Sequence, residues 1–244
     1  AVAAVSPADK YFTQRLQDPA RQSNKYLQKG AIFFRLIGDP GSLVVGGLTY
    51  GVGRVAGNRR AEDIGLHSVE AVLLSGAITG VTKMVAGRAR PYKDTANSLN
   101  FGLMRGLHGG TDYQSFPSGH TTAAFAFASI ISAETSHWWP GSRWVIGPIF
   151  YGGAALTGVS RVYNQFHWAS DVVAGPHPAR GDHGEPGAGD EVLVPGLHHV
   201  GEDAVQPGSA QIVVDGVTIA FPLGEAIDRA LDRFGATASV AKRT

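Results

Sequence analysis

A histidine and an aspartate four positions apart form the first group whose spacing could do chemistry. In the segment SRVYNQFHWASD, His167 and Asp171 stand at i and i+4, so in a helix the carboxylate would reach the imidazole. An aspartate on one ring nitrogen fixes the tautomer and leaves the other nitrogen basic and nucleophilic. Arg161 in the same segment adds a cation. The alternative is an exposed helical ion pair with no function.

A proline-serine-glycine-histidine run, Pro117 to His120, forms the second group and directly precedes an apolar stretch. Ser118 suits the N-cap of a helix that starts there, and Gly119 would let a ligand approach the backbone closely. The free amides of a helix N-terminus bind anions, and His120 beside them could give or take a proton near neutral pH. The alternative is an ordinary capped helix with a surface histidine.

Two cations seven positions apart form the third group. Lys83 and Arg90 are separated by about two helical turns and would therefore share one helix face, with Pro91 ending the helix beside Arg90. Two cations that converge from an apolar helix suit a multiply charged anion. The alternative is a positively charged helix C-terminus that satisfies its own carbonyl groups.

Taken together, the three groups resemble, in order and spacing, the signature of the type 2 phosphatidic acid phosphatase and vanadium haloperoxidase superfamily. That signature reads K-x6-R-P, then P-S-G-H, then S-R-x5-H-x3-D, and the resemblance covers roughly residues 30–174. Every signature position is filled here, by Lys83, Arg90, Pro91, Pro117, Ser118, Gly119, His120, Ser160, Arg161, His167 and Asp171.

The resemblance implies a role for each polar residue of the signature. His167 would attack phosphorus and form a phosphohistidine, with Asp171 orienting the ring and stabilising its charge. His120 would protonate the leaving alkoxide and then help to activate water. The phosphoryl oxygens would be held by Lys83, Arg90, Ser118, Gly119 and Arg161.

The implied function is metal-independent hydrolysis of phosphomonoesters or diphosphates, carried by a lipid or by a small soluble ester. Phosphoryl transfer needs mainly positioning and charge stabilisation, which three cations and a helix N-terminus supply. No cofactor is expected, and vanadate is expected to inhibit. Two alternatives are a vanadate-dependent haloperoxidase, in which His167 would ligate vanadium, and an inactive anion-binding or membrane structural protein. The resemblance places the protein in the cell envelope, either periplasmic or membrane-associated.

Helices must position these residues. Period-two alternation is absent before residue 175, so we predict an all-α fold, a bundle of about six helices with the site between helix ends. Residues 8–29 predict one or two amphipathic helices broken near Pro19. The apolar, helix-length stretches, rich in Ala, Gly, Leu, Val and Ile, are 31–38, 42–57, 64–86, 122–135 and 143–160.

The apolar stretches leave the relation to a membrane open. A membrane span needs roughly 20 apolar residues, and the longest charge-free apolar run, 144–159, falls a little short. The stretch 64–86 contains charged residues. Either the chain is a soluble bundle with unusually apolar helices, or it is a membrane bundle of short, tilted helices whose polar residues face inward.

The composition narrows the class of protein. The chain has 244 residues, a net charge of +1 and no cysteine, which excludes disulfides, zinc–thiolate sites, iron–sulfur clusters and a cysteine nucleophile. The balanced charge argues against bulk nucleic-acid binding. The first residues, AVAAVSPADKYF, show neither the basic nor the apolar region of a secretory signal. We therefore expect either a cytosolic chain or numbering that begins after processing.

Charge is distributed unevenly along the chain. Residues 1–174 carry 16 Lys and Arg against 10 Asp and Glu, whereas residues 175–244 carry 5 against 10. Gly and Pro crowd the segment 175–209, which suits neither a helix nor a packed strand. We therefore predict a helical phosphatase domain over 1–174, a linker over 175–209 and a small appendage over 210–244.

The C-terminal part departs from the family pattern. An Asp-Gly pair between β-branched runs predicts a hairpin over 211–222, and helical spacing predicts a helix over 223–235. Pro176 and Pro178 are expected to stop the helix that carries Asp171 after about one turn, whereas in relatives that helix runs on for several turns. This shortening would weaken the packing behind the nucleophile.

Other polar residues flank the signature without belonging to it. Arg88, Lys93 and Arg105 are expected to make minor contributions, so Arg88→Ala should cost much less activity than His167→Ala. The histidines of the tail lack firm ligand spacing, and no metal site is predicted.

Overall fold

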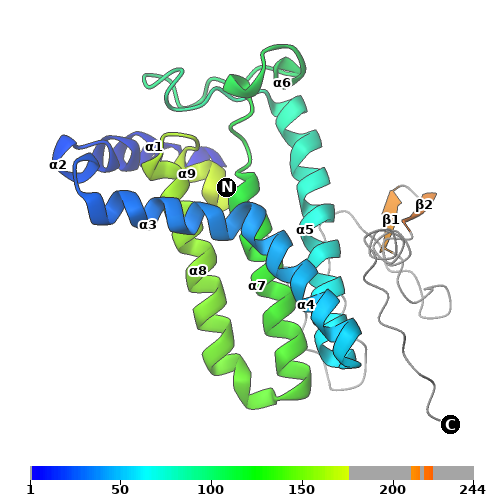
Figure 1. The fold of residues 1–244 in the computed structure, drawn as a ribbon. Coiled ribbons are helices and arrows are strands. Elements are labelled where there is room, and N and C mark those ends of the chain that lie inside the picture. The colour runs from blue at the N-terminus through cyan, green and yellow to red at the C-terminus, as the bar shows by residue number, and fades with distance from the viewer. Residues whose placement is uncertain (1, 176–209, 215–216, 222–244) are drawn as a thin grey trace, which may run out of the picture.

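The computed structural model describes residues 2–175, 210–214 and 217–221 (Figure 1). Residues 2–175 form helices and loops without a strand, which confirms the predicted all-α fold for this part of the chain. Its longer helices are α1 (Val2–Leu16), α3 (Lys25–Leu36), α4 (Ser42–Ala56), α5 (Arg59–Ala86), α7 (Gly119–Trp138) and α8 (Arg143–Tyr163). Its short ones are α2 (Pro19–Gln22), the π-helical η1 (Ile37–Gly41), α6 (Arg105–His108), the 3-10 turns η2 (Thr111–Tyr113) and η3 (Pro140–Ser142), and α9 (Ala169–Ala174).

Four helices, α4, α5, α7 and α8, run side by side and pack in that order (Figure 1). Helix α3 crosses against α8, and α1 packs on the short helix α9 and on α8. The C-terminal end of α5, the N-terminal end of α7 and the C-terminal end of α8 therefore meet at the same end of the bundle. The three sequence motifs lie at these helix ends, as the predicted placement of the site requires.

The chain turns sharply between α3 and α4. Asp39 has φ −155° and ψ 121°, which is extended and not helical, and it precedes Pro40. A residue before proline disfavours the helical region, so the break is encoded locally. Gly38 in this kink lies against α7 and α8, because a Cβ there would stand 2.5 Å from Thr157 Cγ2 and 3.1 Å from the His120 carbonyl oxygen. The kink thus brings the end of α3 to the motif-bearing end of α7.

Helices α4 and α5 pack at close range and are joined by a tight turn. A Cβ at Gly65 would lie 2.1 Å from the backbone nitrogen of Tyr50, so only glycine permits this approach. Gly57 ends α4 in the left-handed region at φ 65°, and Asn58 caps α5 by accepting from the amide of Ala61 at 3.3 Å. This local sequence fixes α5, the helix that ends beside the site.

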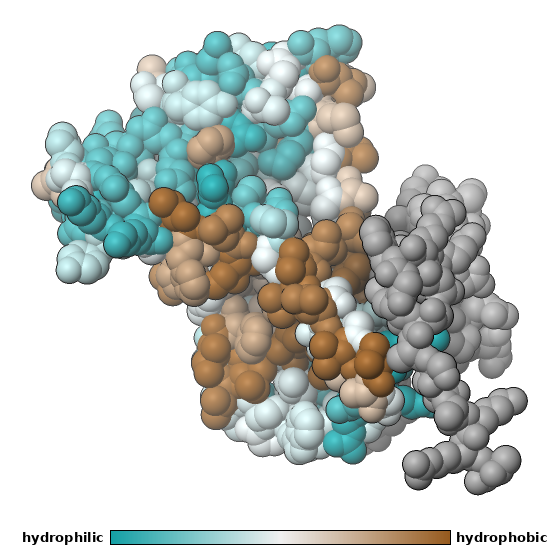
Figure 2. Space-filling view, viewed as in Figure 1, coloured by the Kyte–Doolittle hydropathy of each residue, from teal (hydrophilic) through white to brown (hydrophobic). Residues whose placement is uncertain are grey.

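The interior of the bundle is small. One core cluster joins Val72 of α5 to Ala123 and Phe127 of α7, and a second joins α7 to α8 through alanines. Many large apolar side chains instead face outward, among them those of Val44, Leu48, Val52, Val81, Trp144, Ile149 and Val159. Figure 2 shows the hydrophobic surface as a band over the lower part of the helices, below a hydrophilic region over α1 and α2.

Two helical stretches are long and apolar enough to cross a membrane. They are Lys25–Ala56, with 32 residues across the kink, and Arg59–Ala86, with 28 residues. Only 22% of each apolar window is buried in the protein, so neither is covered in the way that the core helix of a soluble protein is. The run 144–159, which the sequence analysis singled out, is not one of these two.

The C-terminal part contributes two strands to the described residues. Strand β1 (Ala210–Val214) pairs antiparallel with β2 (Val217–Phe221), in a register that sets Val214 opposite Val217. This pairing confirms the predicted hairpin. The proposed linker beyond residue 175 and the predicted helix over 223–235 lie outside the described residues, and the domain division remains a prediction.

Candidate active site

The end of α5 differs from the sequence prediction. The helix stops at Ala86, and Gly87 caps it in the left-handed region at φ 52°. Lys83 is therefore in the last helical turn, whereas Arg90 lies in the non-helical segment that follows and does not share a helix face with it. The two cations still converge, because each donates to the loop that precedes α7. Lys83 Nζ donates to the Gln114 carbonyl at 2.9 Å, and Arg90 Nε donates to the Thr111 carbonyl at 2.7 Å.

The third cation of the signature, Arg161, is buried with two of its donors unpaired within the described residues. Arg161 is only 4% exposed, and within the described residues its Nε and Nη1 find no hydrogen-bond acceptor. Its guanidinium stacks on the Phe166 ring at 4.6 Å, and the like charge of Arg90 repels it. Burial first, and then Arg90, lower the pKa of Arg161 to about 10, so the group remains charged at neutral pH. Buried donors of this kind fit an anion in the site.

The N-terminus of α7 faces the same place. Ser118 is the N-cap residue, as predicted, but its side chain does not cap the helix; its hydroxyl lies 2.8 Å from the Thr121 hydroxyl. A Cβ at Gly119 would meet only ordinary contacts, at 3.6 Å from Lys83 Cε and 3.7 Å from Thr79 Cγ2. The fold therefore does not require glycine there, which leaves a close ligand as the better reason for it. The first amides of α7 lack partners within the helix, and Gly119 at its start lies beside Lys83.

His167 is held mainly by a backbone carbonyl. It lies just before α9 and not within it, so the predicted helical i, i+4 contact with Asp171 does not form in that way. Its Nδ1 lies 2.6 Å from the Ser115 carbonyl oxygen and 3.6 Å from Asp171 Oδ2. A carbonyl can only accept, so Nδ1 carries the proton and Nε2 keeps a free lone pair. Burial lowers the pKa of His167 to about 3 although Asp171 opposes it, so the ring is neutral and able to act as a nucleophile.

Asp171 is bound more tightly to the wall behind His167 than to the ring itself. Its Oδ2 accepts from the Ser115 hydroxyl at 2.6 Å and from the Trp168 amide at 2.8 Å, and its Oδ1 accepts from Arg88. Burial alone would raise the pKa of Asp171, but the His167 contact and the Arg88 charge bring it below its ordinary value. Asp171 is thus a buried anion beside the nucleophile.

Arg88, which the sequence suggested only as a flank of the site, is a buried part of the wall behind it, and the small activity cost expected from the sequence for Arg88→Ala stays a prediction. Its side chain is 0% exposed and donates to Asp171, Asp9, the Ser170 hydroxyl at 2.7 Å and the Ser98 carbonyl at 2.9 Å. Helix α5 ends at Ala86, before either arginine, so the two side chains take different directions in the non-helical segment that follows. Arg90 turns toward the loop and the site, while Arg88 turns into the interior.

His120 stands in the first turn of α7 at the mouth of the site. Its Nδ1 is 4.0 Å from Asp39 Oδ2 of η1, and its side chain is 26% exposed. Burial and the charge of Arg161 lower its pKa to about 3, so the ring is neutral before an anion is present. A bound phosphate dianion would oppose both causes and favour the protonated ring.

Sequence reasoning missed three residues of this site. Ser115 lies two residues before the P-S-G-H run and was not expected to contribute. Arg88 is one of the six unspecified positions of K-x6-R-P and was expected only to flank the site. Asp9 had no signal at all, because nothing in an N-terminal helix points to a contact with α9. The flanking Lys93 and Arg105 serve the loop: Lys93 pairs with an exposed carboxylate at 3.3 Å, and Arg105 Nη2 donates to the Gly87 carbonyl at 2.7 Å.

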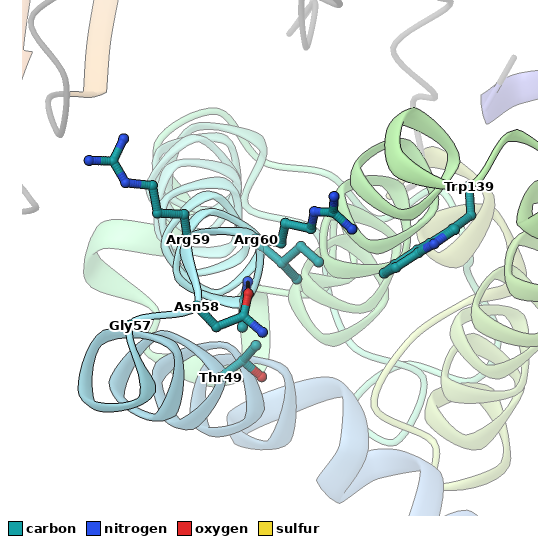
Figure 3. Close-up of a pocket in the computed structure, with 8 residues that line it drawn as sticks. Thr49, Gly57, Asn58, Arg59, Arg60 and Trp139 are labelled. Atoms are coloured by element: carbon teal, nitrogen blue, oxygen red, sulfur yellow. Dashed lines mark hydrogen bonds between the residues drawn. The ribbon is translucent and has the colours of Figure 1, made fainter.

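A separate pocket of about 650 Å³ opens at the opposite end of the bundle (Figure 3). It lies between the α4–α5 turn and the α7–α8 turn, and at its edge the Arg60 guanidinium lies over the Trp139 ring at 5.5 Å. The Arg60 guanidinium also stacks on the Trp138 ring at 4.5 Å. None of the signature residues lines this pocket. The hydrophobic band therefore lies between two polar ends of the bundle. The motifs are at the end opposite this pocket.

An all-helical bundle with a neutral buried histidine and three converging cations suits the binding of an oxyanion. A scan against family models agrees, because residues 65–176 match the PAP2 superfamily. The matched part is a little under half of the chain. The match spans all three motifs.

Three similar proteins have names that describe enzymes acting on phosphorylated lipids. A lipid A 1-phosphatase of Porphyromonas gingivalis is 39% identical over 83 residues, which are 33% of this chain and 17% of that protein. A lipid A 1-phosphatase of Rhizobium etli is 31% identical over 112 residues, covering 46% and 44%. An undecaprenyl-diphosphatase of Sulfolobus acidocaldarius is 31% identical over 117 residues, covering 48% and 50%. The matches therefore span half or less of each of these relatives.

A solved structure shares the fold. The first transmembrane PAP2 type phosphatidylglycerolphosphate phosphatase from Bacillus subtilis superposes with a TM-score of 0.53 at 22% identity, over 71% of this chain and 82% of that one. The resemblance supports the helical architecture described above.

Proposed function

We propose that this chain is a metal-independent lipid phosphatase that hydrolyses a phosphomonoester or diphosphate through a phosphohistidine. The observation that carries the proposal is Arg161, a buried guanidinium with two donors unpaired within the described residues. The charge of Arg90 acts on Arg161, and the charges of Arg161 and His167 act on His120, so the four groups lie close together. A tetrahedral oxyanion would satisfy these donors together with Lys83 and the first amides of α7.

The reaction follows from the two histidines. His167 Nε2 attacks phosphorus, the P–N bond forms, and the P–O bond to the alkoxide breaks. His120, protonated in the presence of the bound dianion, gives its proton to the leaving oxygen. Water then attacks phosphorus, His120 takes a proton from it, the P–N bond breaks, and inorganic phosphate leaves with His167 neutral again.

Charge stabilisation in this scheme comes from the chain itself. Lys83, Arg90 and Arg161 surround the position of the equatorial oxygens, and the amides at the start of α7 add partial positive charge. We therefore expect no requirement for a divalent ion. Orthovanadate should inhibit, since it adopts the five-coordinate geometry of the transition state.

The substrate class follows from the outer surface. The outward-facing apolar side chains form a band around α4, α5 and α8, and the site lies at one polar end of that band (Figure 2). A lipid whose chains lie in a membrane would present its phosphate at this level. The names of the relatives, lipid A 1-phosphatase and undecaprenyl-diphosphatase, point to the same class.

The test compares two substrates under one set of conditions. The purified chain is assayed in mixed micelles with a lipid phosphate and, in parallel, with a soluble aryl phosphate, in the presence of EDTA and with orthovanadate titrated in. We expect turnover that ignores EDTA, stops with vanadate and favours the lipid. His167→Ala should abolish it, whereas His137→Ala, an exposed histidine at the other end of α7, should not. Loss of activity with EDTA, or equal activity of the His167→Ala variant, would contradict the proposal.

A further inference from the structure

Asp9 is a fully buried carboxylate that the mechanism above does not use. It lies on α1, which packs against α9 (Figure 1), and it is 0% exposed. Its Oδ1 accepts from the Ser170 amide at 2.7 Å, and its Oδ2 accepts from the Ser170 hydroxyl at 2.8 Å. A buried carboxylate is costly unless it is paired, so a specific reason for it is required.

The partner of Asp9 is the same arginine that binds Asp171. Arg88 Nη2 donates to Asp9 Oδ2 at 2.8 Å, and Arg88 Nη1 donates to Asp171. All three side chains are 0% exposed, and the guanidinium also lies over the Phe101 ring at 4.8 Å. One buried cation is therefore shared by two buried anions, one on α1 and one beside the nucleophile.

This sharing leaves negative charge next to His167. If Arg88 had Asp171 as its only carboxylate, the two charges would cancel, and the ring would face the cations Lys83 and Arg90 without compensation. With Asp9 on the other side of Arg88, the trio carries a net negative charge. His167 gains positive charge when Nε2 bonds to phosphorus, so that negative charge stabilises the ring as the bond forms. The other group facing the ring, His120, is neutral before an anion binds.

We propose that Asp9 is a positioning residue for the nucleophile: it holds and neutralises Arg88, so that Asp171 keeps its charge and its place beside His167. The inference rests on the proposed function, since it assigns a role in the same site. Helix α1 thereby also closes the wall behind α9, the helix whose shortness suggested weak packing from the sequence.

Two oxyanions distinguish this role from a purely structural one. Inorganic phosphate stays four-coordinate and is held by the cations and amides alone. Orthovanadate accepts a further bond from a nucleophilic nitrogen and therefore reports on His167. If Asp9 acts through Arg88 and Asp171, its loss should weaken vanadate binding and leave phosphate binding nearly unchanged.

The experiment measures the dissociation constants of both ions by calorimetry on the full chain in detergent, together with kcat and KM. For Asp9→Asn we expect vanadate to bind about 10-fold more weakly and kcat to fall by about the same factor, as is typical for partners that orient a site residue from outside. Phosphate binding and KM should stay within about twofold, because the groups that hold the phosphoryl oxygens are untouched. The matched control is Thr13→Val, also buried on α1 but outside this network, which should change neither ion.

A second variant covers the case in which Asp9→Asn does not fold. Asp9→Asn with Arg88→Met removes an anion and the cation together, which buried sites tolerate better than the loss of one partner. In this double variant Asp171 keeps its charge and its bonds to Ser115 and Trp168. The dissociation constant of vanadate should therefore stay within about threefold of the wild-type value, a smaller change than in Asp9→Asn alone.

The outcomes separate the two proposals. Equal weakening of vanadate and phosphate by Asp9→Asn, or no weakening of either, would overturn the role of Asp9. In the double variant, a vanadate-specific loss well beyond threefold would do the same. A wild-type chain that binds both ions but turns over no substrate would overturn the proposed function, and the vanadate comparison would still decide the role of Asp9.

Discussion

Arg88 and Arg161 are both buried, at 0% and 4% exposure, yet their surroundings are opposite. Arg88 lies in the wall behind the proposed nucleophile and donates hydrogen bonds to two carboxylates, a hydroxyl and a carbonyl. Arg161 lies in the proposed phosphate site and leaves two donors unpaired within the described residues. A buried cation that is fully bonded belongs to the fold, whereas one that is not bonded marks the place of a ligand. Residue type alone does not distinguish the two; hydrogen bonding does.

The largest effect on stability should come from removing Arg88, the fully hydrogen-bonded arginine. Arg88→Ala leaves Asp9 and Asp171 as unpaired buried anions, and removing one partner of a buried ion pair costs about 3–5 kcal/mol of unfolding free energy. We expect a pronounced fall in the thermal midpoint in detergent and loss of activity with it. Arg143→Ala, an exposed arginine at the far end of α8, is the control and should unfold as the wild type does. A stable Arg88→Ala variant would remove the basis of the comparison.

The second effect is the reverse case, in which activity is lost while stability is kept. Arg161→Ala removes buried donors that have no protein partner, so the free energy of unfolding should stay the same or rise. Turnover should fall by about 10²–10³-fold, the usual loss for one donor to a transition-state oxyanion. Parallel melting curves and initial rates check both halves. If Arg161→Ala destabilised the fold as much as Arg88→Ala, the unpaired donors would have a structural role.

The third effect sharpens the comparison by filling the site. Phosphate binds only the folded chain, so at about 100 times its dissociation constant it should add about 2.7 kcal/mol to the free energy of unfolding. The gain should vanish in Arg161→Ala and persist in Arg143→Ala. The measurement is the thermal midpoint against phosphate concentration at constant ionic strength. An equal gain in all three proteins would indicate a general salt effect.

The sequence predicted the fold class and the convergence of the motif residues far better than the contacts that those residues make. Apolar stretches of helix length sufficed for an all-α bundle, and motif spacing sufficed to bring Lys83, His120 and His167 to one end of it. The partner of His167 could not be predicted, because the Ser115 carbonyl is a backbone group brought there by a loop. Spacing alone suggested Asp171 for that place.

Asp9 and Arg88 show the limit of motif reasoning most clearly. Arg88 and Arg90 are two residues apart, and their spacing does not show that the helix ends before both of them, at Ala86, or that Arg88 is the more deeply buried of the two. That end depends on the left-handed cap at Gly87, where a Cβ would lie 2.1 Å from the Gly102 carbonyl oxygen. The contact of Asp9 with α9 joins positions more than 160 apart in the chain. No local pattern carries such information.

The smallest effect concerns the second pair of histidine and carboxylate. Asp39 lies 4.0 Å from His120 Nδ1, like Asp171 beside His167, but its side chain is 59% exposed. Water and salt screen an exposed carboxylate, so Asp39→Asn should lower kcat by no more than about threefold, and the difference should shrink further at high ionic strength. Initial rates at low and high salt measure it, with the equally conservative Asp18→Asn on the surface as control. A loss comparable to that of Asp171→Asn would mean that Asp39 holds His120 directly during the reaction, and burial would then not be what separates the two pairs.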